Sequence, residues 1–136
     1  MNTTRLAAWL GIALGVVGAG LKVVRVLRQA EWWPFFLYDY FAAALLIIGG
    51  IAVLRRTGGV RVLAAGWGFG VAMCYGSFFG HLEKWTQGTG SDLAFEKTMS
   101  ISVGVLLAIN LVGLALTLWR GDQAQGLASR ADAVAA

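Results

Sequence analysis

Residues 98–119, TMSISVGVLLAINLVGLALTLW, contain no Asp, Glu, Lys or Arg, and Arg120 follows them directly. An α-helix rises about 1.5 Å per residue, so a run of this length covers the hydrocarbon core of a bilayer, which is about 30 Å thick. A basic residue at the end of such a run lies at the membrane surface. The stretch therefore predicts a membrane-spanning helix.

Three earlier runs, at residues 6–27, 35–54 and 62–82, are also apolar and nearly uncharged, although the first has basic residues near its end. We predict an all-α integral membrane four-helix bundle with both termini on the same side of the membrane. One domain, residues 1–120, contains the four spans. Residues 121–136 are small, polar and rich in alanine, and we predict that they form a tail that is mobile or weakly helical.

The composition excludes a soluble domain and several kinds of site. Hydrophobic residues make up 58% of the chain and charged residues 13%, against about 25% charged residues in soluble domains. The single Cys74 excludes an intrachain disulfide, and the single His81 excludes a two-histidine metal or haem site within one chain. A homodimer would supply each residue twice. We predict contact with the lipid bilayer and no nucleic-acid partner.

The basic residues between the second and third runs predict the orientation of the chain. Arg55, Arg56 and Arg61 occupy one short turn, and short loops weigh most in the positive-inside rule. Four spans bring both termini to the same side as this turn. We therefore expect the termini in the cytoplasm, and a plasma membrane or a bacterial inner membrane as the location.

Small residues recur every four positions in three of the runs. In lipid, such spacing brings helix backbones into close contact. The longest series lies in the third run, and its partner is either a neighbouring helix or another copy of the protein. The predicted packing residues are Gly11, Gly15, Gly68, Ala72, Gly76, Gly80, Ser100, Gly104 and Ala108.

Ionisable residues gather at one side of the predicted bundle. Asp39, His81, Glu83 and Glu96 all lie near span ends on the face opposite the termini. Charges at membrane depth are costly and often functional, so these four residues and the central Asn110 are candidates for a ligand or ion path. The alternative is structural: salt bridges would tie the outer ends of the helices together.

Polar residues inside the third and fourth runs form two further stripes. One stripe lies on one side of the fourth run and consists of Ser102, Asn110, Gly113 and Thr117. The other lies on one side of the third run and consists of Cys74, Ser77 and His81. Two readings stay open, a polar seam through the bundle and simple hydrogen bonds between helices, of which the second is favoured.

Two segments resemble a known family. The stretch from Arg5 to Lys22, with Leu10-Gly11 and Gly18, loosely resembles the first helix of DoxX-like four-helix membrane proteins. The Gly49-Gly50 pair followed by Arg55-Arg56 is similar to their second helix. The resemblance implies a four-helix bundle and assigns no chemistry.

Three functions follow, in order of preference. The first is a non-enzymatic membrane subunit that associates with itself or with another membrane protein, because no catalytic residue and no metal-ligand set stands out. The second is a small homo-oligomeric transporter or channel that uses the ionisable residues. The third is a membrane enzyme or cofactor carrier that uses His81, with an unidentified cofactor.

Overall fold

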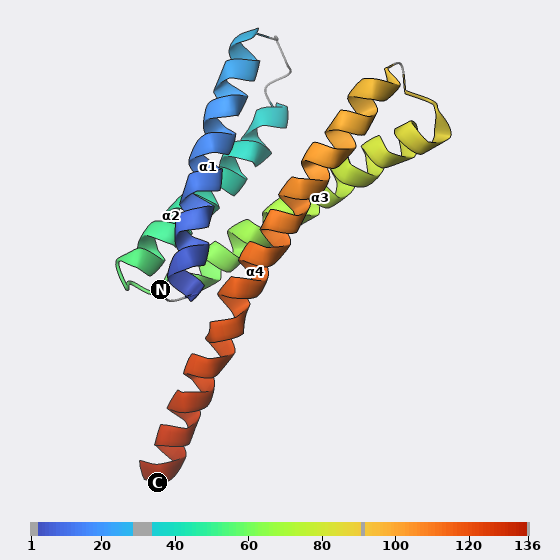
Figure 1. Cartoon of the computed structure of the whole chain (residues 1–136). Coiled ribbons are helices and arrows are strands. Elements are labelled where there is room, and N and C mark those ends of the chain that lie inside the picture. Colours follow the sequence, from blue (N-terminus) through green and yellow to red (C-terminus); the bar gives the residue numbers. More distant parts are fainter. Residues whose placement is uncertain (1–2, 29–33, 91, 136) are drawn as a thin grey trace.

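The computed structural model contains four helices in the residues that it describes (Figure 1). It describes the backbone of residues 3–28, 34–90 and 92–135, and the side chains of 3–23, 37–90 and 92–119. The helices are α1 (Thr3–Arg28), α2 (Pro34–Leu54), α3 (Val60–Gln87) and α4 (Leu93–Ala135). No strand occurs in these ranges. The predicted all-α fold is confirmed.

Each helix contains a stretch that is long and apolar enough to cross a membrane. The stretches are Thr3–Val23, Leu37–Leu54, Val60–Gln87 and Leu93–Trp119, so each predicted span falls on one helix. Large apolar side chains remain exposed on every helix, for example Leu21, Ile48 and Trp119. In water this surface would be costly, whereas in a bilayer it contacts lipid. The chain is an integral membrane protein that contacts the lipid bilayer.

The turn between α3 and α4 has a helix cap on each side. Gly88 caps the C-terminus of α3, and its left-handed backbone (φ 67°) lets its N–H reach the Trp85 carbonyl. Helix α4 begins where the Asp92 carboxylate accepts hydrogen bonds from the N–H groups of Ala94 (3.0 Å) and Phe95 (3.1 Å). These two caps end α3 and start α4 on either side of the turn.

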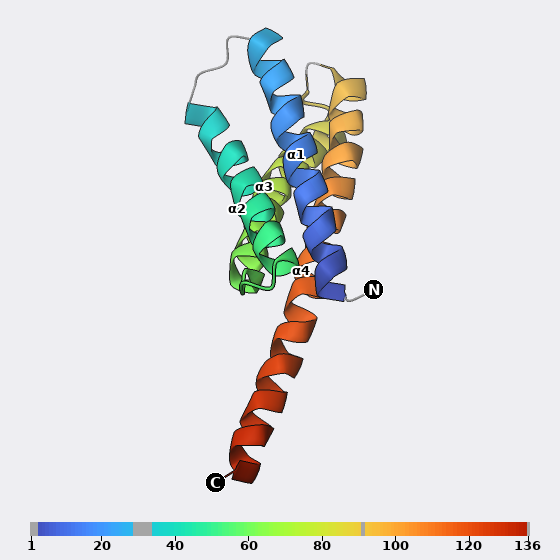
Figure 2. The same ribbon diagram turned by 90° about the vertical axis from the view of Figure 1, so that its left-hand side faces the viewer.

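The fourth helix continues far beyond its apolar stretch. Its backbone is helical to Ala135 and extends away from the other helices (Figure 2). The predicted tail, residues 121–136, is therefore helical up to Ala135. Its side chains lie outside the described ones, and its mobility stays a prediction, as does the division of the chain at residue 120.

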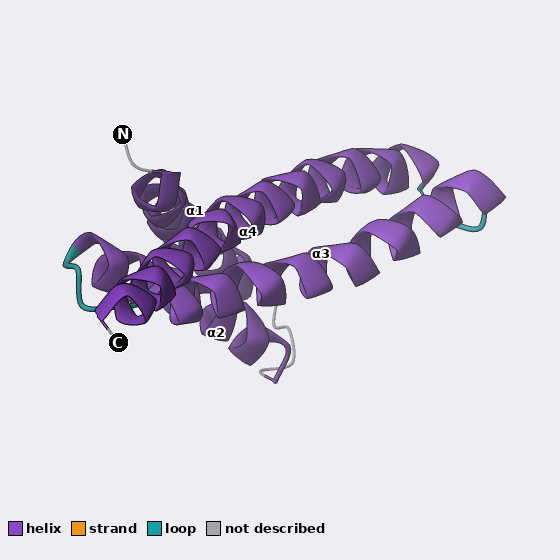
Figure 3. Cartoon of the chain, turned by 90° about the horizontal axis from the view of Figure 1, so that it is seen from below, coloured by secondary structure: helices purple, strands orange, loops and turns teal. Residues whose placement is uncertain are grey.

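The helices form two antiparallel hairpins, α1–α2 and α3–α4, that cross near the turn between α2 and α3 (Figure 1). Toward the opposite end the hairpins diverge, and α3 and α4 run on beside each other (Figures 1 and 3). Helices α2 and α4 do not contact each other in the described part of the chain. The N-terminus lies at the end of the bundle that holds the α2–α3 turn, and α4 leaves the bundle at that same end. The two termini therefore share one side, as predicted.

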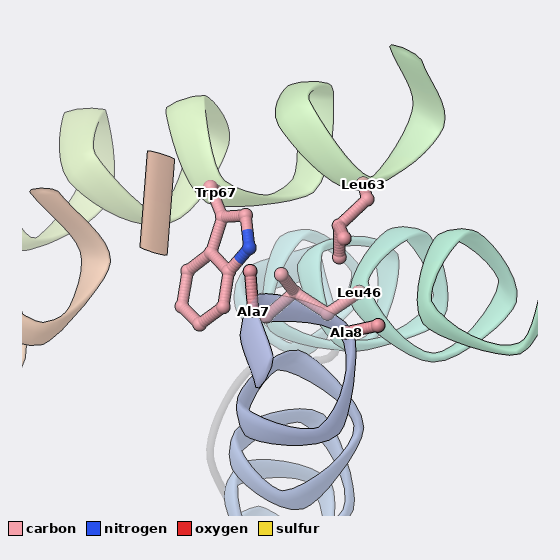
Figure 4. Packing of buried hydrophobic residues seen from close by; sticks show 5 residues of the cluster. All are labelled: Ala7, Ala8, Leu46, Leu63 and Trp67. Carbon is pink, nitrogen blue, oxygen red and sulfur yellow. The ribbon is translucent and has the colours of Figure 1, made fainter. Parts of the chain in front are cut away.

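The buried core lies where the hairpins cross (Figure 4). Leu63 and Trp67 of α3 are fully buried, and they pack on small or branched residues of the first two helices. Gly113 of α4 makes room for the indole, because a Cβ atom there would lie 2.5 Å from the Trp67 ring. The core members are Ala7, Ala8, Leu46, Leu63 and Trp67.

Glycines bring the backbones of α2 and α3 together. A Cβ atom at Gly49 would collide with the backbone of Leu63, and one at Gly66 would lie 2.9 Å from the backbone nitrogen of Leu46. A Cβ atom at Gly50 would lie 2.9 Å from the carbonyl oxygen of Ala8 in α1. Such close approach maximises dispersion contacts between helices, which is the main source of association in lipid. The crossing therefore depends on residues without side chains.

Candidate functional site

The polar side chains that are buried in the described part of the chain all belong to α4. They are Glu96, Ser100, Asn110 and Thr117, each less than a tenth exposed. Their spacings of four, ten and seven residues keep them on one side of a helix with 3.6 residues per turn. This side faces the other helices, so α4 presents a polar stripe to the interior of the protein.

The outer end of this stripe holds an acid paired with the chain's single histidine. His81 Nδ1 lies 2.5 Å from Glu96 Oε2, and the side chains are 25% and 9% exposed. The Phe95 ring stands edge-on to the imidazole at 6.2 Å. A Cβ atom at Gly90 would lie 2.6 Å from Glu96 Cγ, so the turn closes directly over the acid. The imidazole is the accessible member of the pair, and the carboxylate is the buried one.

The middle of the stripe is the Asn110 amide. Its Nδ2 donates to the Leu106 carbonyl at 2.8 Å and lies 3.9 Å from Cys74 Sγ. Its Oδ1 sits against Gly70, where a Cβ atom would collide, and has no hydrogen-bond partner. Thr117, at the inner end, donates to the Gly113 carbonyl at 2.7 Å. The hydrogen bonds to Leu106 and Gly113 lie within α4, and only the contacts of Asn110 with Cys74 and Gly70 cross to α3.

An aromatic ring divides the stripe into two parts. Phe78 of α3 packs on Gly104, where a Cβ atom would lie 3.0 Å from the ring. Gly104 lies between Ser100 and Asn110 in the sequence, one helical turn after Ser100. The Ser100 hydroxyl is buried and has no partner, so it does not bridge the gap. The described polar groups therefore form an outer pair and an inner cluster rather than one continuous path.

The five residues predicted as a ligand or ion path do not meet in one place. Asp39 forms an ion pair with Lys22 at 2.7 Å, between α1 and α2. Glu83 is exposed and accepts a hydrogen bond from Gln87 at 3.2 Å. Only His81 and Glu96 come together, and Asn110 lies deeper. The role of these residues stays a prediction.

The two predicted polar stripes differ in part from the observed one. Ser77 is exposed, and Ser102 is exposed with its hydroxyl on the Thr98 carbonyl at 2.8 Å. The observed stripe contains Glu96 and Ser100 instead, because these residues lie on the buried side of α4, which faces the other helices. The helical spacing of Glu96, Ser100, Asn110 and Thr117 was available in the sequence and would have identified this side.

The predicted packing residues fall into two groups. Gly11 and Gly15 contact side chains of other helices, Ser100 is buried, and Gly104 contacts Phe78. Ala108 and Ala72 are exposed, and nothing lies within 4 Å of a Cβ atom placed at Gly68, Gly76 or Gly80. We call Gly68, Ala72, Gly76 and Gly80 the open ridge. The prediction that it packs against another helix finds no partner in the described part of this chain.

Other glycines, which the spacing argument did not select, make the closest contacts. Gly66 and Gly70 of α3 face α2 and α4, and we call them the inner ridge. They are also four residues apart, so the same four-residue spacing of small residues was present in the sequence. The longer series that begins at Gly68 was selected instead. The other close contacts involve single glycines and a glycine pair, for which spacing gives no signal: Gly49, Gly50 and Gly113.

Neither a protein-family model, nor a curated protein, nor a solved structure matches this chain. No family model therefore supports the resemblance to DoxX-like proteins. Within the described residues, no group of three or more His, Cys, Asp and Glu side chains is placed to hold a metal ion. The structure supports a small multi-pass membrane protein of four helices.

Proposed function

We propose that this protein is a non-enzymatic membrane subunit that associates with a second copy of itself through the open ridge of α3. The observation that carries the proposal is that Gly68, Gly76 and Gly80 face empty space within their own chain. Ala72 completes the series and is exposed. Four small residues at this spacing form a flat strip along one side of a helix, onto which a second helix fits closely.

Helix α3 itself supports this interpretation. Its inner ridge receives the α2 backbone at Gly66, where a Cβ atom would lie 2.9 Å from Leu46 N. Small residues on the same helix are thus used for close helix contact. The open ridge offers the same chemistry over a longer distance, and glycine within a helix costs about 1 kcal/mol relative to alanine unless packing compensates. A helix of a second copy would supply that packing.

An ion path within one chain is less well supported. Phe78 separates the His81–Glu96 pair from the Asn110 cluster, and Asp39 is engaged with Lys22 on the other hairpin. A transporter would therefore need a path formed between copies, which also requires association first.

The first experiment compares two glycines that are both open in the structure. Gly76→Leu places a branched side chain on the open ridge, and Gly18→Leu places the same side chain on α1, where nothing lies within 4 Å either. Native mass spectrometry of protein gently extracted from its own membrane is expected to show a dimer for wild type and Gly18→Leu. Gly76→Leu is expected to shift the protein to monomer.

The outcomes separate the alternatives. A monomeric wild type without a second protein would contradict the proposal. A stoichiometric foreign protein that Gly76→Leu releases would replace self-association by an accessory role on the same face.

Cross-linking tests where the copies meet. In a Cys74→Ala background, a cysteine at Gly76 is expected to form a disulfide-linked dimer on oxidation, whereas a cysteine at Gly18 is not. Efficient cross-linking at Gly18 alone would place the interface on α1 and overturn the assignment to α3.

We also propose that both termini lie in the cytoplasm, because the arginine-rich turn between α2 and α3 lies on their side. Thr57 and Gly88 are exposed residues of the two turns at opposite ends. Single cysteines at these positions, in the Cys74→Ala background, are expected to react with a membrane-impermeant reagent from opposite sides. Labelling of the Thr57 position from outside intact cells would reverse the orientation.

A further inference from the structure

The turn between α2 and α3 carries a concentration of unpaired positive charge. Arg55, Arg56 and Arg61 are all exposed, and no acidic side chain in the described part of the chain forms an ion pair with them. Three guanidinium groups within seven residues repel one another unless an anion lies among them. The protein itself does not provide that anion among its described side chains.

The opposite end of the bundle is arranged differently. There Lys22 pairs with Asp39 at 2.7 Å, and His81 pairs with Glu96 at 2.5 Å. Lys97 lies over the Trp85 ring, with its Nζ 5.7 Å from the centroid. Within the described residues, Lys22, His81 and Lys97 thus have partners at this end and Lys84 has none, whereas all three arginines at the other end lack one.

Backbone hydrogen bonds fix the shape of the arginine-rich turn. Arg55 N–H donates to the Ile51 carbonyl at 2.9 Å, and the Thr57 N–H and hydroxyl both donate to the Ala52 carbonyl, at 3.0 and 3.1 Å. Arg56 has a φ of 59°, a left-handed conformation that bulky residues rarely adopt. The hydrogen bonds on both sides hold it there. Arg55 and Arg56 consequently project from a defined turn, and Arg61 projects from the first turn of α3.

Helix electrostatics explain two of the arginines and leave the third unexplained. Arg55 and Arg56 follow the C-terminus of α2, where the helix dipole favours positive charge. Arg61 lies in the first turn of α3, where the dipole disfavours it, and that turn contains no acidic residue. An external anion beside Arg61 would offset this repulsion.

The depth of the turn identifies the anion. The turn joins two membrane-spanning stretches that end at Leu54 and begin at Val60, so its side chains lie at the level of the lipid headgroups. Phosphate oxygens accept paired hydrogen bonds from the planar guanidinium group. We propose that Arg55, Arg56 and Arg61 form a binding site for the headgroup phosphate of an anionic phospholipid. This site is independent of the association through α3.

The test measures lipid retention with defined vesicle lipids. The full chain is reconstituted in nanodiscs of phosphatidylcholine with a minor fraction of phosphatidylglycerol, released, and examined by native mass spectrometry for bound lipid. Each arginine near an anionic surface contributes about fivefold to binding. Arg61→Gln is therefore expected to reduce phosphatidylglycerol retention about fivefold, and the triple variant R55Q/R56Q/R61Q on the order of a hundredfold.

A matched control removes the same kind of charge elsewhere. K84Q/K97Q neutralises two exposed lysines at the opposite end and is expected to retain phosphatidylglycerol as wild type does. Cysteine labelling at Thr57 checks the orientation of the triple variant, and Arg61→Gln keeps two arginines in the turn. Wild-type retention by correctly oriented Arg61→Gln and triple variants would overturn the site. Equal loss in K84Q/K97Q would overturn it as well, since charge at either end would then suffice.

Gly76→Leu separates this inference from the proposed function. The variant is expected to lose the dimer and to keep the bound phosphatidylglycerol. Loss of the lipid together with the dimer would contradict a site formed by one chain.

Discussion

Two sides of helix α3 carry small residues at the same four-residue spacing, and their surroundings differ completely. The inner ridge meets the backbone of α2 at Gly66 and the amide of Asn110 at Gly70. The open ridge begins at Gly68, two residues or about 200° further round the helix, and meets nothing within 4 Å at any of its glycines. Spacing alone therefore identifies a surface that can pack, and the neighbouring helices decide which surface does.

The difference follows from what stands opposite each ridge. Leu46 and Leu63 interlock beside the inner ridge, and Gly49 lets the two backbones approach there. Nothing lies within 4 Å of a Cβ atom placed at Gly68, Gly76 or Gly80, and the two hairpins diverge toward the end opposite the termini (Figure 1). In lipid, nothing pushes the hairpins together along their whole length, because lipid tails are as apolar as the side chains.

The largest expected effect comes from blocking the inner ridge. Gly66→Leu would drive a branched side chain into the backbone of α2, where a Cβ atom alone would lie 2.9 Å from Leu46 N. We expect a loss of about 3 kcal/mol in the free energy of unfolding, or no folded protein at all. Unfolding of the reconstituted protein with increasing sodium dodecyl sulphate, followed by circular dichroism, measures this loss.

The control for that variant is Gly68→Leu on the same helix. Since nothing lies near Gly68, its effect on unfolding of the monomer is expected to stay within about 0.5 kcal/mol. Equal destabilisation by Gly66→Leu and Gly68→Leu would contradict the conclusion that only the inner ridge is packed within the monomer.

The sequence predicted the helices well because their signal is local. Residues 98–119 are apolar throughout, and each predicted span falls on an observed helix. The contacts between helices depend on which sides face each other. Gly49 and Gly113 matter because Leu63 and Trp67 stand opposite them, which is information about other parts of the chain.

The candidate site was predicted in outline only. His81 and Glu96 were both identified, and the structure places them in contact, while Asp39 and Glu83 have separate partners. Membrane depth groups all four residues at one end, yet it does not distinguish the two hairpins. Asp39 lies on α2 and His81 on α3, and the divergence of the two hairpins, which is a property of the whole fold, leaves them with separate partners.

A smaller effect is expected from the pair that joins the outer ends of α3 and α4. His81→Ala and Glu96→Ala each remove the 2.5 Å contact between Nδ1 and Oε2. A double-mutant cycle is expected to give a coupling energy of about 2 kcal/mol, as for other hydrogen bonds to charged groups. The pair Glu83 and Gln87, exposed and within one helix, is the matched control and is expected to couple by less than about 0.5 kcal/mol.

The smallest effect is expected at Asn110, the polar residue that faces the inner ridge. Its amide contacts Cys74 at 3.9 Å and otherwise bonds within its own helix, so Asn110→Ala removes little attraction between helices. Hydrogen bonds between helices in bilayers average about 0.6 kcal/mol, and we expect a loss of that size in the same unfolding assay. Its Oδ1 is buried without a partner, which lowers the benefit of keeping the amide. A loss as large as that of Gly66→Leu would mean that polar contacts, rather than backbone approach at glycines, distinguish the occupied side of α3 from the open one.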